Sequence, residues 1–221
     1  MVLAGSDARC GLGPGDHMTL TANDIQALII ETIRSPATAA QKLLSLRLPV
    51  NFLWMALVLM SVLNSIVYSL AIGINPPVDP QSGMMMVPAA FQSPLLFTLI
   101  LFAALIVSVF ALHRMGQAIG GGRGELGDIL TVITWMQLLR LVLQIAVLVL
   151  GLVLPVLGGL LALIGSFYGL YVLGVLLKAA HRYTSLSQAF ILMLAVFLTV
   201  VVGLALILAI LSGLFIGGTT L

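Results

Sequence analysis

The chain has 221 residues, of which 61% are hydrophobic and only 7% are charged. Soluble domains carry about 25% charged residues, so a globule of this composition could not cover its surface in water, and we expect a membrane protein. The formal net charge of +2 is too small to indicate nucleic-acid binding, and the single cysteine, Cys10, excludes an internal disulfide or a cysteine-based metal cluster.

The N-terminal part of the chain has two predicted sections. Residues 1–20 are glycine-rich and carry no apolar periodicity, so we expect a disordered tail there. In residues 21–48 the apolar side chains recur at helical spacing, at Ile25, Leu28, Ile29 and Ile33. This second section is therefore predicted to form one or two amphipathic helices.

Local signals mark where these helices start. Thr21 and Asp24 have the spacing of a capping box. Pro36 follows Ser35 and favours a second helix start, because proline suits the first turn of a helix. The basic residues on these helices favour a position in the interface of the cytoplasmic leaflet, with lipid within reach. The alternative is a cytoplasmic segment that packs against the membrane bundle.

Five segments are long and apolar enough to cross a bilayer, which requires about 20 mostly apolar residues per helix. They cover residues 50–74, 94–113, 129–152, 157–177 and 187–215. Pro155 and the glycines after it form the turn signal that separates the third segment from the fourth. The predicted fold class is all-α: an N-terminal amphipathic segment, a polytopic bundle of five transmembrane helices over residues 49–216, and a tail at 217–221.

Basic residues gather at alternate ends of these spans. Apart from Arg9 near the start of the chain, seven lie before the first span, between the second and third, or between the fourth and fifth: Arg34, Lys42, Arg47, Arg114, Arg123, Lys178 and Arg182. The loops at 75–93 and 153–156 contain no Lys or Arg. The positive-inside rule therefore predicts a cytoplasmic N-terminus and a C-terminus on the opposite side. Trp54 and Trp135 fall near the predicted cytoplasmic ends of their spans, where interfacial aromatic residues are frequent.

Two loops have an unusual composition. The loop at 75–93 is rich in proline and is expected to be irregular. The glycine-rich stretch before the third span follows no predicted strand and ends in no Lys-Ser/Thr pair, which excludes a phosphate-binding loop. We expect Asp128 to cap the helix that follows, near the positive end of its dipole.

The sequence lacks paired acids, a metal cluster and an activated nucleophile, so we expect no enzyme activity, no metal and no cofactor.

Arg140 is the one charged residue within a predicted span. An arginine at the centre of a transmembrane helix costs about 2.5–3.5 kcal/mol on insertion scales. Because helical side chains point back toward the N-terminus, the guanidinium could reach toward cytoplasmic headgroups. Gln137 lies one turn nearer that side, and Gln144 lies one turn beyond, so the three residues form a polar stripe along the third span.

This stripe of Gln137, Arg140 and Gln144 is the candidate site of the sequence, and two uses remain open. It could pin its helix by contacting lipid headgroups or a neighbouring helix. It could instead bind a ligand or partner in a water-filled recess that opens to the cytoplasm. Neutral side chains that could meet it lie in the first and fourth spans: Asn64, Tyr68, Tyr168 and Tyr171. No span contains Asp, Glu or Lys, which argues against a proton- or cation-coupled carrier.

Two stretches resemble the Yip-domain membrane proteins, the Ypt/Rab-interacting family. "GGGRGELGDILTVITWMQLLRLVLQ" is similar to that family's loop and third span. "FYGLYVLGVLLKAAHRYTSLSQAF" is similar to its fourth span, its short basic link and the start of its last span. The resemblance covers about residues 30–215 and implies five spans with the N-terminus inside.

The resemblance implies a protein without catalytic activity that organises membranes, assists assembly or recruits partners. Eukaryotic members carry an acidic-Leu-Tyr-Gly-Pro motif ahead of the spans, and this chain has none, so small-GTPase binding is not carried over. The chain is similar to the bacterial branch, which implies the bacterial inner membrane. Expected partners are the lipid bilayer and either further copies of the chain or other membrane proteins. The alternative function is an oligomeric pore or small-solute permease that uses the polar stripe.

Overall fold

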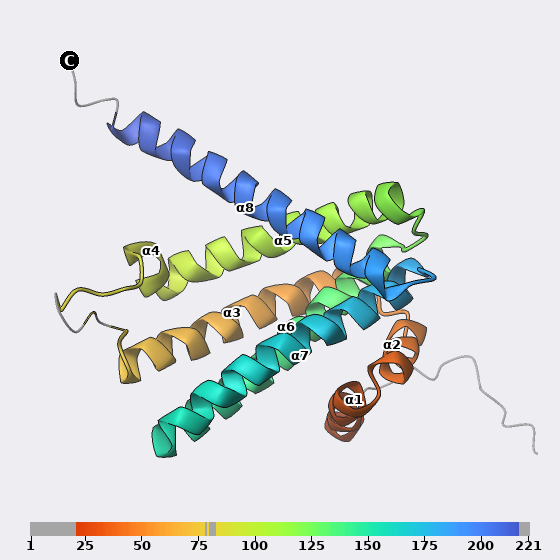
Figure 1. The fold of residues 1–221 in the computed structure, drawn as a ribbon, viewed down its shortest axis with the longest axis horizontal. Coiled ribbons are helices and arrows are strands. Elements are labelled where there is room, and N and C mark those ends of the chain that lie inside the picture. The colour runs from red at the N-terminus through yellow and green to blue at the C-terminus, as the bar shows by residue number, and fades with distance from the viewer. Residues whose placement is uncertain (1–20, 78, 80–82, 217–221) are drawn as a thin grey trace, which may run out of the picture.

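The computed structural model describes residues 21–77, 79 and 83–216 (Figure 1). The predicted tails at 1–20 and 217–221 lie outside the described residues. The elements are α1 (Ala22–Arg34), α2 (Pro36–Ser45), α3 (Val50–Ile74), α4 (Ala89–Gln92), α5 (Pro94–Gly120), α6 (Leu126–Val153), α7 (Pro155–His181) and α8 (Leu186–Ile216).

Five of these helices, α3, α5, α6, α7 and α8, are long and apolar enough to cross a membrane, which confirms the predicted fold class. Helix α6 begins three residues before the predicted span. Its N-terminus is closed by a capping box in which the backbone N–H of Glu125 donates to the carboxylate of Asp128 at 3.4 Å. Asp128 therefore caps the helix from inside its first turn, and Glu125 occupies the N-cap position.

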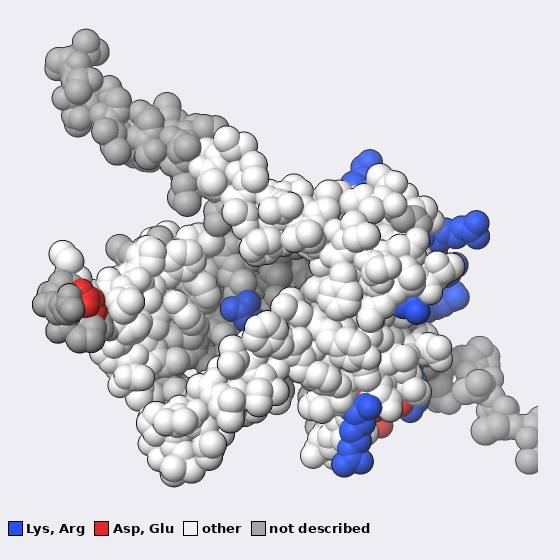
Figure 2. All heavy atoms as spheres, in the orientation of Figure 1, with Lys and Arg blue, Asp and Glu red and all other residues white. Residues whose placement is uncertain are grey.

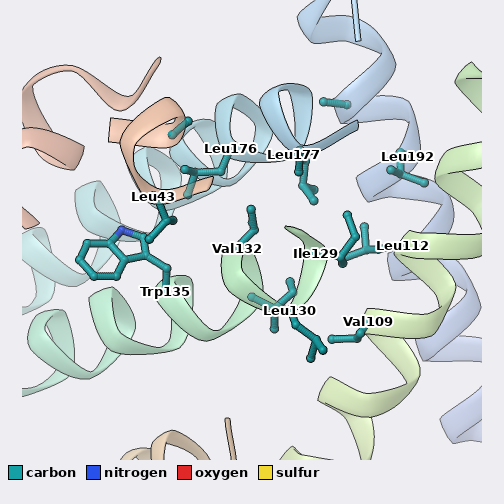
Figure 3. Packing of buried hydrophobic residues seen from close by; sticks show 14 of the residues in the cluster. Leu43, Val109, Leu112, Ile129, Leu130, Val132, Trp135, Leu176, Leu177 and Leu192 are labelled. Atoms are coloured by element: carbon teal, nitrogen blue, oxygen red, sulfur yellow. The ribbon is translucent and has the colours of Figure 1, made fainter. Parts of the chain in front are cut away.

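The apolar core of the bundle lies mainly near one end. We call the end that carries Arg47, Arg114, Arg123, Lys178 and Arg182 the basic end, and the opposite one the far end. Core side chains from α5, α6, α7 and α8 meet near the basic end (Figure 3): Val109, Leu112, Ile129, Leu130, Val132, Leu176, Leu177 and Leu192. These residues are almost fully buried, so the apolar contacts that hold the helices together are concentrated in one half of the bundle.

Toward the far end the bundle is more open, although α6 and α7 stay in close contact near their hairpin. The buried residues of α8 that the structure describes are Ala189, Leu192 and Val196, all in its first half, where the helix contacts α5 and α7. Figure 1 shows the second half of α8 leaving the bundle. The far halves of α6 and α7 expose large apolar side chains, including Leu152 and Val156. In a bilayer these surfaces face lipid tails or other apolar helices.

The predicted amphipathic segment forms two helices, α1 and α2, with the predicted start signals. The backbone N–H of Asp24 donates to the hydroxyl of Thr21, and the N–H of Thr21 donates to the Asp24 carboxylate, which completes the capping box. The hydroxyl and N–H of Thr21 hold the pKa of Asp24 below its ordinary value, because both donate to the ionised carboxylate. Pro36 opens α2 in its first turn.

Helices α1 and α2 pack against the side of the bundle. Helix α2 contacts α7 and α6 and buries Ala39, Ala40 and Leu43. The indole N–H of Trp135 donates to the hydroxyl of Thr32 in α1 at 3.2 Å, so Trp135 is buried in the structure and contacts this segment. Packing on the bundle was the alternative that the sequence left open. Position in the membrane interface stays a prediction.

Two connections on the far side differ in regularity. The loop between α3 and α5 contains the short helix α4, so the expectation that 75–93 is irregular throughout was wrong. Between α6 and α7 the chain turns at Leu154, and Pro155 starts α7. A Cβ at Gly158 would lie 2.7 Å from the Cα of Gly151, so this tight hairpin requires glycine at position 158.

Candidate functional site

A groove of about 860 Å³ lies between the far halves of α3 and α7, with α6 beneath it. Its polar lining comes from Tyr68, Asn75, Arg140, Gln144 and Ser166. We call it the Arg140 groove. Figure 2 shows blue atoms in a hollow, surrounded there by uncharged surface. A volume of this size is within the range of ligand pockets, about 300–1,000 Å³.

Arg140 is exposed to this groove and has no acidic partner there. The one salt bridge found among the described residues joins Lys42 in α2 to Glu31 in α1, at 2.7 Å. The aromatic ring of Tyr68 lines the same groove from α3 and stacks on Phe97 at 4.3 Å. The guanidinium therefore presents its donors to a space that holds no compensating charge from the described side chains.

The predicted stripe is divided by the packing of α3 against α6. Gln144 lines the Arg140 groove, and its amide oxygen is buried without a hydrogen-bond partner. Gln137 does not line the groove and is only 8% exposed. Its backbone carbonyl accepts a hydrogen bond from the Asn64 side-chain amide at 3.2 Å, whereas its own amide oxygen has no partner. The structure thus brings Arg140 and Gln144 together and places Gln137 in a helix–helix seam.

Of the four neutral residues expected as possible partners of the stripe, two lie near it and two do not. Tyr68 faces the groove, and Asn64 contacts the stripe through the backbone of Gln137. Tyr168 instead donates its hydroxyl to the carbonyl of Ile33 in α1 at 2.6 Å. Tyr171 lies against Tyr168, with ring centroids 5.9 Å apart. Tyr168 therefore contacts α1, and neither of these two tyrosines lines the groove.

The groove ends at Arg140. On the side toward the basic end, the α3–α6 seam is filled by Leu57, Asn64 and Gln137, which are between 0% and 8% exposed. Beyond them lies the apolar core. A second cavity of about 140 Å³ lies among α1, α3 and α6 and shares no lining residue with the groove. In the part of the chain that the structure describes, the groove is therefore a recess open on the far side. The expectation of an opening toward the cytoplasmic, basic end was wrong, because the buried seam closes the groove there.

A cluster around His181 was not predicted from the sequence. His181 is 1% exposed, with its ring nitrogens 3.2 Å from the carbonyl oxygens of Leu177 and Leu112. Tyr183 stacks on this ring and donates its hydroxyl to the carbonyl of Gly116 at 2.8 Å. Burial raises the pKa of the Tyr183 phenol, so it remains a donor at ordinary pH. A Cβ at Gly116 would overlap the imidazole of His181, so the packing of this ring favours glycine at position 116.

No group of three or more His, Cys, Asp or Glu side chains that could hold a metal comes together within the described ranges. The expectation of a protein without a metal or cofactor stays a prediction. The apolar lining and the lone guanidinium suit binding of an anionic or amphipathic group better than acid–base chemistry, which needs a group that titrates near neutral pH.

The comparison with protein families gives one match. The model of the Yip1 domain matches residues 30–216, which includes α2 to α8 and the end of α1. Searches of curated proteins and of solved structures found no significant match. Because the matched region covers most of the sequence and all five candidate spans, the chain belongs to the Yip1 domain family.

Proposed function

We propose that this chain is a non-enzymatic membrane protein that organises a bacterial inner membrane or recruits partners to it, with the basic end in the cytoplasm. The observation that carries this proposal is the closed core at the basic end. A pore requires a continuous polar path, whereas the Arg140 groove stops at the seam of Asn64 and Gln137. A bundle that is closed on one side supports a role in assembly or organisation.

The basic end also offers a surface for recruitment. Arg114, Arg123 and Arg182 are exposed there and take part in no salt bridge within the described residues. Basic residues near an anionic leaflet contribute about 1 kcal/mol each to membrane attraction, and they also attract acidic protein segments. The positive-inside rule supports a cytoplasmic location for this end.

Photo-crosslinking in cells tests recruitment. A photoreactive amino acid at Arg123 or Arg182 should give discrete cross-linked products, and one at Val156 on the far end should give mainly lipid or self-adducts. The matched control carries the photoreactive amino acid at the same position. In this control, the unlabelled residues among Arg114, Arg123 and Arg182 are replaced by Gln. Equal products from both ends, or products that persist in the charge-depleted variant, would contradict recruitment by the basic end.

The Arg140 groove favours one second candidate, an oligomeric permease. Arg140 and Gln144 line a recess, and the open far half leaves room for a second copy to complete its wall. Proteoliposomes that contain the purified chain and a trapped small anion separate the two candidates. We expect no release above that of protein-free vesicles. Release that disappears in Arg140→Gln would favour the permease.

A further inference from the structure

The position of Arg140 in α6 requires an explanation. It lies near the middle of the helix, about 20 Å from either end at the rise of an α-helix. A guanidinium at this depth is usually buried against a polar partner or linked to water. Arg140 is neither buried nor paired with a described acidic side chain. The groove is therefore the place where its charge must be compensated.

The groove connects Arg140 to the far surface and to the side of the bundle. It follows α6 from Arg140 to Leu152, which is about 18 Å and comparable to the hydrocarbon thickness of one leaflet. In Figure 2 the helices run across the view, and the hollow opens between them on the flank of the bundle, where lipid lies in a membrane. A molecule could therefore enter laterally and keep its apolar part in the bilayer.

The lining determines which chemistry fits. Apolar side chains such as Val67, Leu143 and Val147 form most of the wall, so the occupant must be largely apolar. Arg140 offers only donors and a positive charge, so the polar part must be an anion. Gln144 lines the groove, and its amide oxygen is buried without a partner. Rotation of this side-chain amide would let it accept a hydrogen bond from a hydroxyl or N–H donor on the same molecule.

A second copy of the chain does not meet these requirements. No span of this sequence contains Asp or Glu, so a packed helix from another copy would bring no charge to Arg140. A free inorganic anion would match the charge but leave the apolar wall uncovered. We propose that the Arg140 groove binds an anionic phospholipid with hydroxyl donors in its headgroup, as in phosphatidylglycerol, with the phosphate against Arg140 and the acyl chains extending sideways into the bilayer.

This inference needs the membrane location but not recruitment at the basic end. Native mass spectrometry of the full chain, purified in mild detergent after equilibration with phosphatidylglycerol or phosphatidylcholine vesicles, measures the lipid retained. We expect retention of phosphatidylglycerol over phosphatidylcholine. Arg140→Gln should lower that retention about tenfold or more, because hydrogen bonds to charged groups are among the strong ones. Arg140→Lys should restore part of it.

A second variant tests the groove without altering its charge. Gly159 lines the groove, and nothing lies within 4 Å of the Cβ it lacks, so Gly159→Phe should fill the space and displace the lipid. Gly169→Phe on the same helix is the matched control, since Gly169 also faces open space and does not line the groove. Arg114→Gln is the matched control for the charge. Size-exclusion profiles and circular dichroism check that every variant folds.

Each outcome is decisive. Wild-type retention lost in Arg140→Gln and Gly159→Phe but kept in both controls supports the lipid site. Equal retention of the two lipids, or full retention in a folded Arg140→Gln, overturns it. Displacement of the lipid by millimolar inorganic phosphate would also overturn it and indicate a solute site. Photo-crosslinking from Arg123 is unaffected if only the lipid inference fails, so the two proposals can fail separately.

Discussion

Polar side chains within the spans differ in their hydrogen bonding. Several small hydroxyls bond to the carbonyl one turn earlier in their own helix, as Ser61 does to Leu57 at 2.8 Å and Thr131 does to Gly127 at 2.8 Å. Such residues cost little in lipid because the helix itself supplies the acceptor. The amides of Gln137 and Gln144 have no such partner for their oxygens, so they depend on what the tertiary structure or a ligand provides.

The contact between Gly116 and His181 gives a prediction at the scale of single residues. Gly116→Ala places a methyl group against a ring that is almost fully buried, and overpacking of this kind costs about 1–3 kcal/mol. We expect a lower midpoint of thermal unfolding in detergent, measured by tryptophan fluorescence. Gly169→Ala is the control, because its Cβ would meet nothing within 4 Å. Equal midpoints for the two variants would show that the His181 cluster tolerates the added methyl group.

At the scale of elements, the attachment of α1 and α2 was the part least visible in the sequence. The apolar spacing of α1 predicts a buried face but does not say what covers it. The structure supplies α6 and α7 as the cover, through Trp135 to Thr32 and Tyr168 to Ile33. The partners in these two hydrogen bonds are separated by 103 and 135 positions in the sequence, so no local pattern could have predicted them.

Removal of the acceptor for Trp135 should loosen this attachment. Thr32→Val leaves the buried indole N–H unpaired, which costs about 1–3 kcal/mol. In a Trp54→Phe background, we expect a red shift of Trp135 emission and faster proteolysis within α1. Thr38→Val, at an exposed position of α2, is the matched control. An unchanged spectrum and cleavage rate in Thr32→Val would mean that α1 stays in place without the hydrogen bond.

At the scale of the whole molecule, the distribution of charge and packing gives the bundle two different ends. The basic end is closed and apolar inside, and the far end is splayed around the Arg140 groove. An odd number of spans would place the two termini of the membrane domain on opposite sides. The direction of insertion stays a prediction of the positive-inside rule and is independent of the packing.

Reporter fusions measure this direction. A reporter active only outside the cytoplasm should be active after Leu221 and within the loop at 75–93, and inactive in the loop between α7 and α8. Replacing all three of Arg114, Arg123 and Arg182 by Glu should weaken the preference for this orientation, because these flanks would then carry negative instead of positive charge. Activity after Leu221 only from a cytosolic reporter would reverse the assignment of both ends.

The sequence alone determined the membrane class, the five spans, the capping box of α1 and the break between α6 and α7. These features depend on hydropathy, helical spacing and short capping motifs, which act over neighbouring residues. Only the tertiary structure decided that Gln137 is buried in a seam while Arg140 and Gln144 share a groove, and that Trp135 is covered by α1. Lipid is as apolar as most of these side chains, so hydropathy does not select which helix faces meet. That choice depends on close fits and hydrogen bonds between residues far apart in the chain.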